Sequence, residues 1–421
     1  MKKFWCLLLI AVCLLGCVAE PDAPVVLVTP APPTDAPSAV PVTVSDAPTE
    51  APSDPATAAP TDAPVTASAP ALSAEERLLR YVRSMTDAEK IGQLCMFGFS
   101  GTKEISSEFR KILQDYAIGN VILYGQNMSR TNSDGGFKQC RELTDSVRKA
   151  SRSAIPLLIS TDVEGGAVTR FKWRPSLYSA KTLGSKNDPD LAYDQFRTIA
   201  EGLQKAGINT DLAPCLDVAK EPEKTFLGKR ILSSDAEIVA NIGVACIEGL
   251  HAGGCLSIVK HFPGHGATSS DSHEVTPVVD KSLDALEDYE LVPFAAAAST
   301  ADGVMVGHIR YPQIDEKHIA SQSELFITEL LRGELGFSGF IMSDDFRMAG
   351  IRNQSALDKA AVQFILAGGD LILCGANHSY QKQILKGLTE AVKDGTISQE
   401  RLNESVIRIL SAKMQVTDWE P

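Results

Sequence analysis

From residue 73 onward, short apolar runs alternate along the chain with longer amphipathic segments. The apolar runs have the length of buried strands and are rich in β-branched residues. Eight such runs are found, at residues 93–99, 120–125, 156–162, 208–217, 255–262, 303–309, 339–345 and 370–375. The segments between them, such as 107–117 and 188–207, carry apolar residues at helical spacing.

Eight repeats of strand then helix predict an α/β fold, a (β/α)8 TIM barrel built as one domain over residues 73–421. A leading helix near residues 74–83 and a closing helix near residues 399–413 complete the pattern. An open doubly wound sheet is the alternative architecture, and the eight repeats favour the barrel over it.

Five of the predicted strands end in side chains that can carry a charge. These are Asp162, Asp217, Lys260 with His261, His308, and Asp344 with Asp345. One buried aspartate commonly caps a helix or satisfies a loop backbone, so a single case would carry no argument. In a TIM barrel, however, the catalytic groups lie at the carboxyl ends of the strands. Five polar ends on one face therefore predict an active site there.

The stretch KHFPGHGATSSDSH, residues 260–273, concentrates the candidate chemistry. It holds three histidines, a lysine and an aspartate. Its first two residues end a predicted strand, whereas the proline and glycines that follow break regular structure. We therefore expect His265, Asp271 and His273 on a loop that can move.

The first 72 residues differ in composition from the rest. Two lysines and the apolar run FWCLLLIAVCLLG, too short to span a membrane, indicate an export signal over residues 1–16. The run ends in LLGC, which resembles a bacterial lipoprotein box and predicts lipid modification of Cys17. Residues 17–72 are rich in proline, alanine and threonine and cannot bury a core, so we expect a disordered tether. The protein is thus expected outside the cytoplasm, anchored to the bacterial cell membrane.

The charge of the chain narrows the possible binding partners. The net charge is −13 at pH 7, and the part after the tether remains acidic, which argues against nucleic acid as a partner.

The cysteines beyond Cys17 show no CxxC spacing and lie mostly in apolar segments, so we expect small buried side chains, although an exported chain could pair two of them. They are Cys95, Cys140, Cys215, Cys246, Cys255 and Cys374.

Four motifs together resemble glycoside hydrolase family 3, and in particular its single-barrel β-N-acetylglucosaminidase branch. They are STDVEGGAVTRF (160–171), DLAPCLDV (211–218), KHFPGHGATSSDSH (260–273) and IMSDDFRMAG (341–350). The resemblance extends from about residue 80 to residue 413. It implies a single barrel without the second domain that many relatives carry.

The resemblance also implies roles for particular residues. Asp344 matches the nucleophile of a retaining mechanism, and Asp345 is interpreted as a structural carboxylate because adjacent strand residues point to opposite faces. His273 would be the acid/base, oriented and charged by Asp271. The hydroxyls of the terminal sugar would be bound by Asp162, Arg170, Arg230, Lys260 and His261. Charged groups suit this task because their hydrogen bonds are stronger than neutral ones.

The expected function is that of a retaining exo-β-N-acetylglucosaminidase, which removes terminal N-acetylglucosamine from peptidoglycan fragments. We expect a monomer that needs no metal or organic cofactor. Val163 and Ala167 stand where relatives often carry glutamine and arginine, so the fit of the aglycone or of the acetamido side stays open. Within the family, a β-glucosidase, a xylosidase or a phosphorolytic enzyme is an alternative.

Two further hypotheses come from different classes of protein. His261, His265, Asp271 and His273 could form the zinc site of a metal-dependent hydrolase, but the spacing matches no familiar metal-binding helix pattern and Lys260 would repel a cation. A tethered lipoprotein could also be a noncatalytic wall-sugar-binding module. A nucleophile together with an acid/base pair is more than binding requires, which favours the enzyme.

Overall fold

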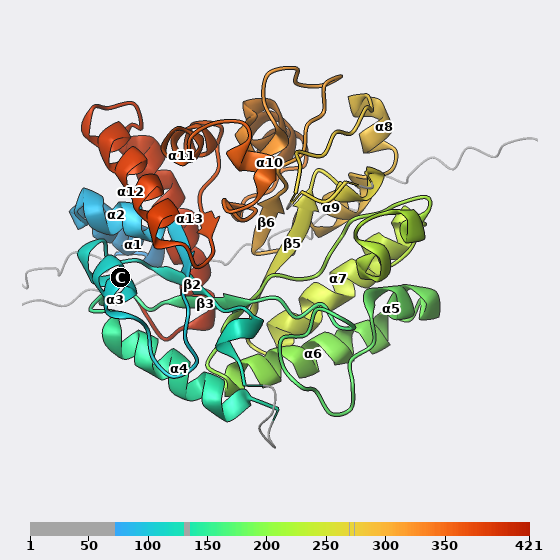
Figure 1. The fold of residues 1–421 in the computed structure, drawn as a ribbon, viewed down its shortest axis with the longest axis horizontal. Coiled ribbons are helices and arrows are strands. Elements are labelled where there is room, and N and C mark those ends of the chain that lie inside the picture. The colour runs from blue at the N-terminus through green and yellow to red at the C-terminus, as the bar shows by residue number, and fades with distance from the viewer. Residues whose placement is uncertain (1–71, 130–134, 269, 273) are drawn as a thin grey trace, which may run out of the picture. The chain divides into compact units, whose positions relative to one another are not determined.

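The structure is a computed structural model of the whole chain and describes residues 72–129, 135–268, 270–272 and 274–421 (Figure 1). The predicted signal and lipid anchor Cys17 lie outside the described residues, and so does the predicted tether except for its last residue. The described residues belong to one compact unit, Ala69–Pro421. None of its described helices is both long enough and apolar enough to cross a membrane.

Eight parallel strands form the centre of this unit, as the sequence predicted. They are β1 (Cys95–Gly98), β2 (Asn120–Ile122), β3 (Leu158–Thr161), β4 (Thr210–Asp211), β5 (Leu256–Phe262), β6 (Gly303–Val306), β7 (Phe340–Ser343) and β8 (Ile372–Cys374). Their order in the sheet is β7-β6-β5-β4-β3-β2-β1-β8. A parallel bridge between Met342 and Leu371 joins the two ends. This ring of strands confirms the (β/α)8 barrel.

Helices follow the strands and surround them (Figure 1). They are α1 (Ala74–Ser84), α2 (Asp87–Gln93), α3 (Ser107–Asp115), α4 (Phe137–Ala150), α5 (Ala180–Lys186), α6 (Pro189–Lys205), α7 (Ala236–Ala252), α8 (Leu283–Glu287), α9 (Val292–Ala297), α10 (Ala349–Arg352), α11 (Leu357–Leu366), α12 (His378–Lys393) and α13 (Gln399–Val416). A segment with π-helical hydrogen bonding, Leu325–Glu334, occupies the place of a helix between β6 and β7. Both terminal helices lie where the sequence predicted them.

Local sequence explains where the first helices begin. The Ser73 hydroxyl accepts the backbone N–H of Glu76 at 3.1 Å, and the Glu76 carboxylate accepts the N–H of Ser73 at 2.7 Å. Thr86 and Glu89 make the same reciprocal pair at the start of α2. Each pair satisfies donors that the helix end would otherwise leave open.

The fourth strand is much shorter than predicted. The apolar pattern predicts a strand over residues 208–217, but β4 covers only Thr210–Asp211. Pro214 lacks the N–H that a strand ladder requires, which ends regular pairing. The chain nevertheless stays beside β5, because the N–H of Leu216 bonds to the carbonyl of Lys260 at 2.7 Å. Asp217 is therefore held against the end of β5.

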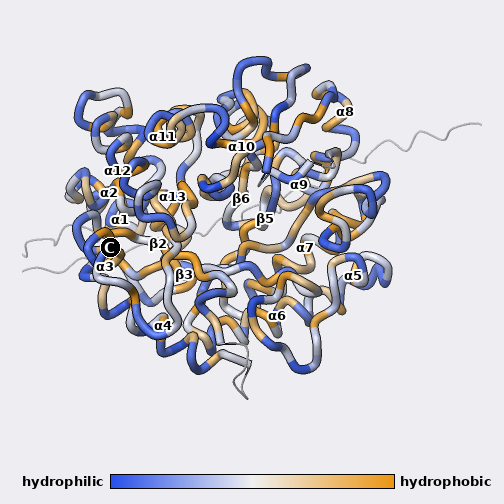
Figure 2. Tube along the Cα trace, viewed as in Figure 1, coloured by the Kyte–Doolittle hydropathy of each residue, from blue (hydrophilic) through white to orange (hydrophobic). Residues whose placement is uncertain are grey.

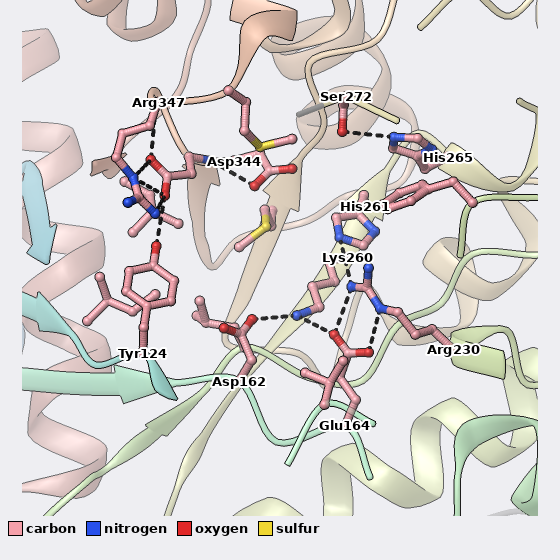
Figure 3. Close-up of a pocket in the computed structure, with 18 of the residues that line it drawn as sticks. Tyr124, Asp162, Glu164, Arg230, Lys260, His261, His265, Ser272, Asp344 and Arg347 are labelled. Atoms are coloured by element: carbon pink, nitrogen blue, oxygen red, sulfur yellow. Dashed lines mark hydrogen bonds and ion pairs between the residues drawn. The ribbon is translucent and has the colours of Figure 1, made fainter. Parts of the chain in front are cut away.

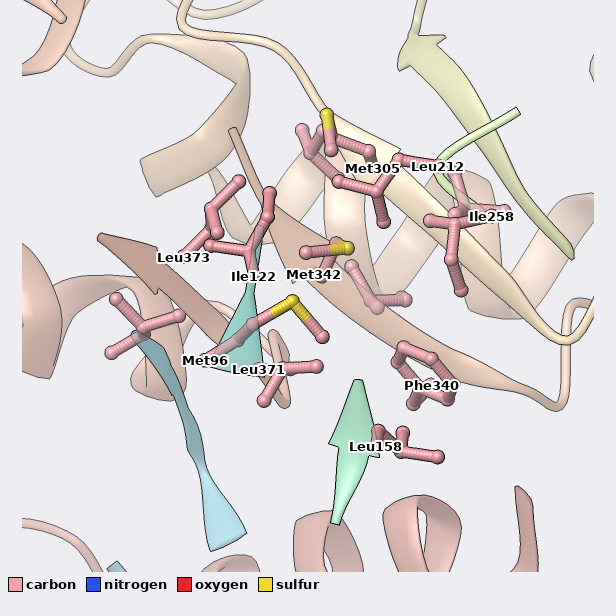
Figure 4. Packing of buried hydrophobic residues seen from close by; sticks show 14 of the residues in the cluster. Met96, Ile122, Leu158, Leu212, Ile258, Met305, Phe340, Met342, Leu371 and Leu373 are labelled. Carbon is pink, nitrogen blue, oxygen red and sulfur yellow. The ribbon is translucent and has the colours of Figure 1, made fainter. Parts of the chain in front are cut away.

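Apolar side chains fill the barrel interior. The residues that meet there include Met96, Ile122, Leu158, Leu212, Ile258, Met305, Phe340, Met342, Leu371 and Leu373 (Figure 4). Hydrophobic positions concentrate on the strands and the helix faces turned toward them, whereas hydrophilic positions lie on the outer segments (Figure 2). The interior is thus a packed core that leaves only the ends of the strands for polar chemistry.

The cysteines that follow the predicted tether are buried and unpaired. All six, Cys95, Cys140, Cys215, Cys246, Cys255 and Cys374, are free thiols in the interior. The expectation of small buried side chains is confirmed, and no disulfide joins any two of them.

Candidate active site

A cavity lies at the carboxyl ends of the barrel strands, where the sequence predicted an active site. Six of the predicted site residues line it: Asp162, Arg170, Arg230, Lys260, His261 and Asp344. Its wall also contains residues without a predicted role in catalysis or sugar binding, among them Tyr124, Glu164, His265, Ser272 and Arg347 (Figure 3).

Five charged side chains alternate in sign along one wall of this cavity. Lys260 is only 2% exposed, and its ammonium lies 2.8 Å from Asp162 Oδ1 and 2.7 Å from Glu164 Oε1. Arg170 donates to the other oxygen of Asp162 at 2.8 Å. Arg230 binds the Glu164 carboxylate through Nε and Nη2, both at 2.8 Å. We call these five residues the charged clamp.

The charged clamp stays ionised at neutral pH. Burial alone would raise the pKa of Glu164, but Lys260 and Arg230 outweigh it and hold that pKa at about 2. At Asp162, the charges of Lys260 and Arg170 likewise outweigh the effect of burial and hold the pKa far below its usual range. The two carboxylates in turn raise the pKa of Lys260 against the effect of its own burial. Hydrogen bonds from such charged groups are well suited to the hydroxyls of a sugar.

Arg170 occupies a backbone conformation that residues other than glycine seldom adopt. Its φ is 53°, in the left-handed region. This conformation follows the turn at Gly165 and Gly166, whose φ values of 89° and 57° also lie in that region. Strained residues of this kind cluster at functional sites, where the surrounding structure enforces them. From this position the guanidinium reaches back to Asp162.

Asp217 lies behind the cavity wall and fixes His261. Its Oδ2 is 2.6 Å from Nδ1 of His261, and it also accepts the backbone N–H of His261 at 3.2 Å. The backbone N–H of His265 bonds to the other oxygen. Nε2 of His261 is 3.4 Å from Arg230 Nη2, which donates to it. These contacts hold both ring nitrogens and orient the imidazole.

Cys215, Asp217 and His261 form the one group of potential metal ligands within the described ranges. Sγ of Cys215 and Nδ1 of His261 lie 3.0 and 2.6 Å from the same carboxylate oxygen. These are hydrogen-bond distances, whereas two ligands of one tetrahedral zinc ion stand about 3.3 Å or more apart. The group is therefore a hydrogen-bonded cluster around Asp217. The zinc site expected as an alternative also required His273, which lies outside the described residues.

The adjacent aspartates after β7 have different surroundings. Asp344 faces the cavity, and its Oδ1 accepts the N–H of Asp345 at 2.7 Å (Figure 3). The Asp345 carboxylate accepts the hydroxyl of Tyr124 at 2.8 Å and the Arg347 guanidinium at 2.7 Å, together with the backbone N–H of Gly375 at 3.1 Å. Both aspartates line the cavity, so adjacency alone does not place Asp345 on the opposite face. The three partners of Asp345 agree with its interpretation as a structural carboxylate.

The predicted acid/base pair is described only in part, since His273 lies outside the described residues. The carbonyl of Asp271 accepts the backbone N–H groups of Glu274 and Val275, both at 3.1 Å, in a turn. Between the pair, Ser272 is 2% exposed and lines the cavity. The loop that carries Asp271 therefore reaches the same cavity as Asp344.

Not every predicted polar strand end lines the cavity. Asp217 and His308 are fully buried and do not contribute to its wall. Nδ1 of His308 is 2.7 Å from Ser321 Oγ, and burial lowers the pKa of His308. Glu164, by contrast, was not predicted. Its position two residues after Asp162 is the signal that was available, because alternate residues of extended backbone point to the same side.

A parallel eight-stranded barrel with ionised carboxylates and cations gathered at the carboxyl ends of its strands defines a TIM-barrel enzyme. Residues 86–412 match the family model described as the glycosyl hydrolase family 3 N-terminal domain. The chain therefore belongs to glycosyl hydrolase family 3, and it is a glycoside hydrolase.

Known relatives agree with this family. A relative named beta-hexosaminidase, from Idiomarina loihiensis, is 34% identical over 295 residues, which are 69% of this chain and 86% of the relative. The structure of a glycoside hydrolase family 3 beta-N-acetylglucosaminidase from Paenibacillus sp. str. FPU-7 is 36% identical, with a TM-score of 0.75 over 79% of this chain. This chain covers 63% of the length of that protein. The structure of a beta-N-acetylhexosaminidase from Beutenbergia cavernae DSM 12333 is 28% identical, with a TM-score of 0.71, over 79% of this chain and 99% of that one.

Proposed function

We propose that this protein is a retaining exo-β-N-acetylglucosaminidase that removes terminal N-acetylglucosamine from peptidoglycan fragments. The observation that carries the proposal is the placement of Asp344 in one cavity with the charged clamp. A sugar ring bound by the clamp presents its anomeric carbon to a nucleophile at the far side of the same cavity. The relatives named beta-hexosaminidase and beta-N-acetylglucosaminidase support the acetamido sugar as substrate.

The reaction proceeds in two displacements. In the first, an oxygen of Asp344 attacks the anomeric carbon, the glycosidic bond breaks, and His273 gives its proton to the leaving oxygen. In the second, His273 takes a proton from water, whose oxygen attacks the same carbon and releases Asp344. Asp271 stabilises the imidazolium form of His273.

The charged clamp binds the sugar while this chemistry occurs. Its residues already hold one another, so a hydroxyl group enters an array of donors and acceptors that is fixed in advance. Lys260 and Arg170 offer N–H donors, and Asp162 accepts. We expect Lys260→Met to weaken binding more than it slows the bound substrate, so that KM rises. Kinetics on the chromogenic substrate described next measure this effect.

The experiment that tests the function compares release of nitrophenol from the β-N-acetylglucosaminide and from the β-glucoside. We expect preference for the acetamido sugar, loss of activity in Asp344→Asn, and a decrease of about 10²-fold or more in His273→Ala. Asp190→Asn, on the exposed first turn of α6, is the matched control and should keep full activity. A folded protein that is inactive on both sugars would contradict the proposal and favour the noncatalytic sugar-binding module.

The same assay separates hydrolysis of the acetamido sugar from the activities that compete with it. Preference for the β-glucoside or a β-xyloside would move the protein to another activity of the family. Sugar 1-phosphate as the product in phosphate buffer would show phosphorolysis. Activity that disappears in excess EDTA and returns with zinc would support a metal-dependent hydrolase, whereas we expect full activity in the chelator.

We further propose that the protein acts outside the cytoplasm as a monomer, held at the bacterial cell membrane through lipidated Cys17. The export signal and the lipoprotein box of the sequence support this location. Wall glycan is the local source of acetamido sugars there. Fractionation of cells that express the wild type and Cys17→Ser tests the anchor: the wild type should pellet with membranes, and the variant should not. Sedimentation of the purified chain tests the monomer.

A further inference from the structure

Ser272 is held at both its side chain and its backbone. Its hydroxyl lies 3.1 Å from Nε2 of His265 (Figure 3). Its carbonyl accepts the N–H of Gly350 at 3.1 Å. Ser272 is 2% exposed and lines the same cavity as Asp344. Two separate parts of the barrel end therefore fix this one residue of the loop.

The first anchor, His265, is itself rigidly placed. It is 1% exposed, its ring lies 5.2 Å from that of Phe226, and its backbone N–H bonds to Asp217. Burial lowers the pKa of His265, and the neighbouring His261 lowers it further, so the ring is neutral at neutral pH. Nδ1 of His265 has no hydrogen-bond partner within the described part of the chain. The contact with Ser272 is thus the hydrogen bond that the ring makes there.

The second anchor lies on the segment that carries the nucleophile. Gly350 belongs to α10, six residues after Asp344 along the chain. A β-carbon at Gly350 would stand 2.9 Å from Cβ of His308 and 3.0 Å from its carbonyl oxygen, which is closer than real β-carbons pack. A glycine is therefore required where α10 packs against His308, and from this position its N–H bonds to Ser272. The hydrogen bond links the loop directly to the segment of Asp344.

We infer that Ser272 is a positioning residue that sets the acid/base pair on either side of it against the nucleophile. It is covalently joined to Asp271 and His273, and its two anchors lie on the turn after β5 and on α10. Proton transfer to a leaving oxygen depends on close alignment, and a misplacement of about 1 Å can cost about 10²-fold in rate. A residue held at two points between the two partners supplies that alignment. This inference rests on the proposed roles of Asp271, His273 and Asp344.

The test uses the full chain and two aryl β-N-acetylglucosaminides that differ in their need for protonation. Dinitrophenolate leaves without a proton, whereas methoxyphenolate needs one. The ratio kcat/KM covers substrate binding and cleavage of the glycosidic bond but not the later hydrolysis of the glycosyl-enzyme, so a slow second step does not obscure the effect. In Ser272→Ala we expect kcat/KM to fall about 10-fold or more on the methoxyphenyl substrate and less than about 3-fold on the dinitrophenyl substrate. Ser272→Thr, which keeps the hydroxyl, should restore the first value.

Further variants make the outcome decisive. His265→Leu removes the same hydrogen bond from the other side and should show the same selective loss. Ser270→Ala, two residues earlier in the loop, is the matched control and should leave both substrates unaffected. Equal losses of Ser272→Ala on both substrates, or no loss on either, would overturn the positioning role. His273→Ala tests the acid/base assignment separately. If His273→Ala does not lose more activity on the methoxyphenyl substrate than on the dinitrophenyl substrate, the acid/base assignment itself fails, which is a different outcome from failure of the role of Ser272.

Discussion

The ammonium of Lys260 lies 2.7 Å from the carboxylate of Glu164, and both side chains are almost fully buried. The sequence did not predict a role for Glu164. It bonds to Lys260 and Arg230, two residues that were predicted to bind sugar. Without it, these two cations would face each other at the wall of the cavity with less negative charge between them. Glu164 therefore positions the binding groups.

Removal of this negative charge should destabilise the protein. Glu164→Gln keeps the shape of the side chain but leaves buried cations without their partner, and breaking a buried ion pair costs about 3–5 kcal/mol. Urea unfolding measures the loss of free energy of unfolding. Glu223→Gln is the control, because the pair of Glu223 with Lys181 is exposed and should contribute less than about 1 kcal/mol. Equal effects of the two substitutions would contradict the role of burial.

The same residue predicts how stability depends on pH. The pKa of Glu164 falls from 4.5 to about 2 in the folded protein, because Lys260 and Arg230 outweigh its burial. A carboxyl with a lowered pKa stabilises the fold fully above its unfolded pKa and loses that contribution as pH falls through the folded value. The wild type should therefore lose about 3 kcal/mol more than Glu164→Gln between pH 4.5 and 2. Unfolding in urea across this range measures the difference, and parallel curves would refute it.

Asp344 and Asp345 should give opposite results when substituted. Asp344→Asn removes the proposed nucleophile and should lower kcat by about 10³-fold or more, with the free energy of unfolding changed by less than about 0.5 kcal/mol. Asp345→Ala leaves the Arg347 guanidinium and the Tyr124 hydroxyl without their acceptor and should destabilise the protein by about 2 kcal/mol. Thermal unfolding and initial rates distinguish the two. A stable, inactive Asp345→Ala would exchange the roles of the two residues.

The buried thiols should be unreactive in the folded protein. Burial raises the pKa of each of the six cysteines after the tether, so the reactive thiolate is scarce and shielded. In a chain of residues 72–421, a disulfide reagent should find no fast-reacting thiol before unfolding and six afterwards. Fewer than six after unfolding under non-reducing conditions would reveal a disulfide.

The sequence predicted the barrel well because strand and helix periods differ clearly and repeat eight times. It overestimated the fourth strand, since the apolar pattern of residues 208–217 does not show that Pro214 interrupts the ladder. The sequence also did not predict the π-helical geometry of Leu325–Glu334, because the apolar spacing of that segment predicts only a helix.

At the site, the sequence located polar residues but not their partners. Asp217 lies beyond the short β4 and His261 lies in β5, and their contact depends on the way the chain beyond Pro214 follows β5. The bond of Ser272 to Gly350 joins segments far apart in sequence. Pairings of this kind follow from the three-dimensional path of the loops, which motifs do not encode.

The charged clamp has a consequence for how the protein meets its ligands. Each charged group is already held by a neighbour, so the side chains lose their freedom when the chain folds and not when a sugar arrives. Rigid sugar mimics should therefore bind with little loss of protein motion. Flexible ligands carry the whole entropic penalty themselves, which makes ring shape the property that a selective inhibitor should match first.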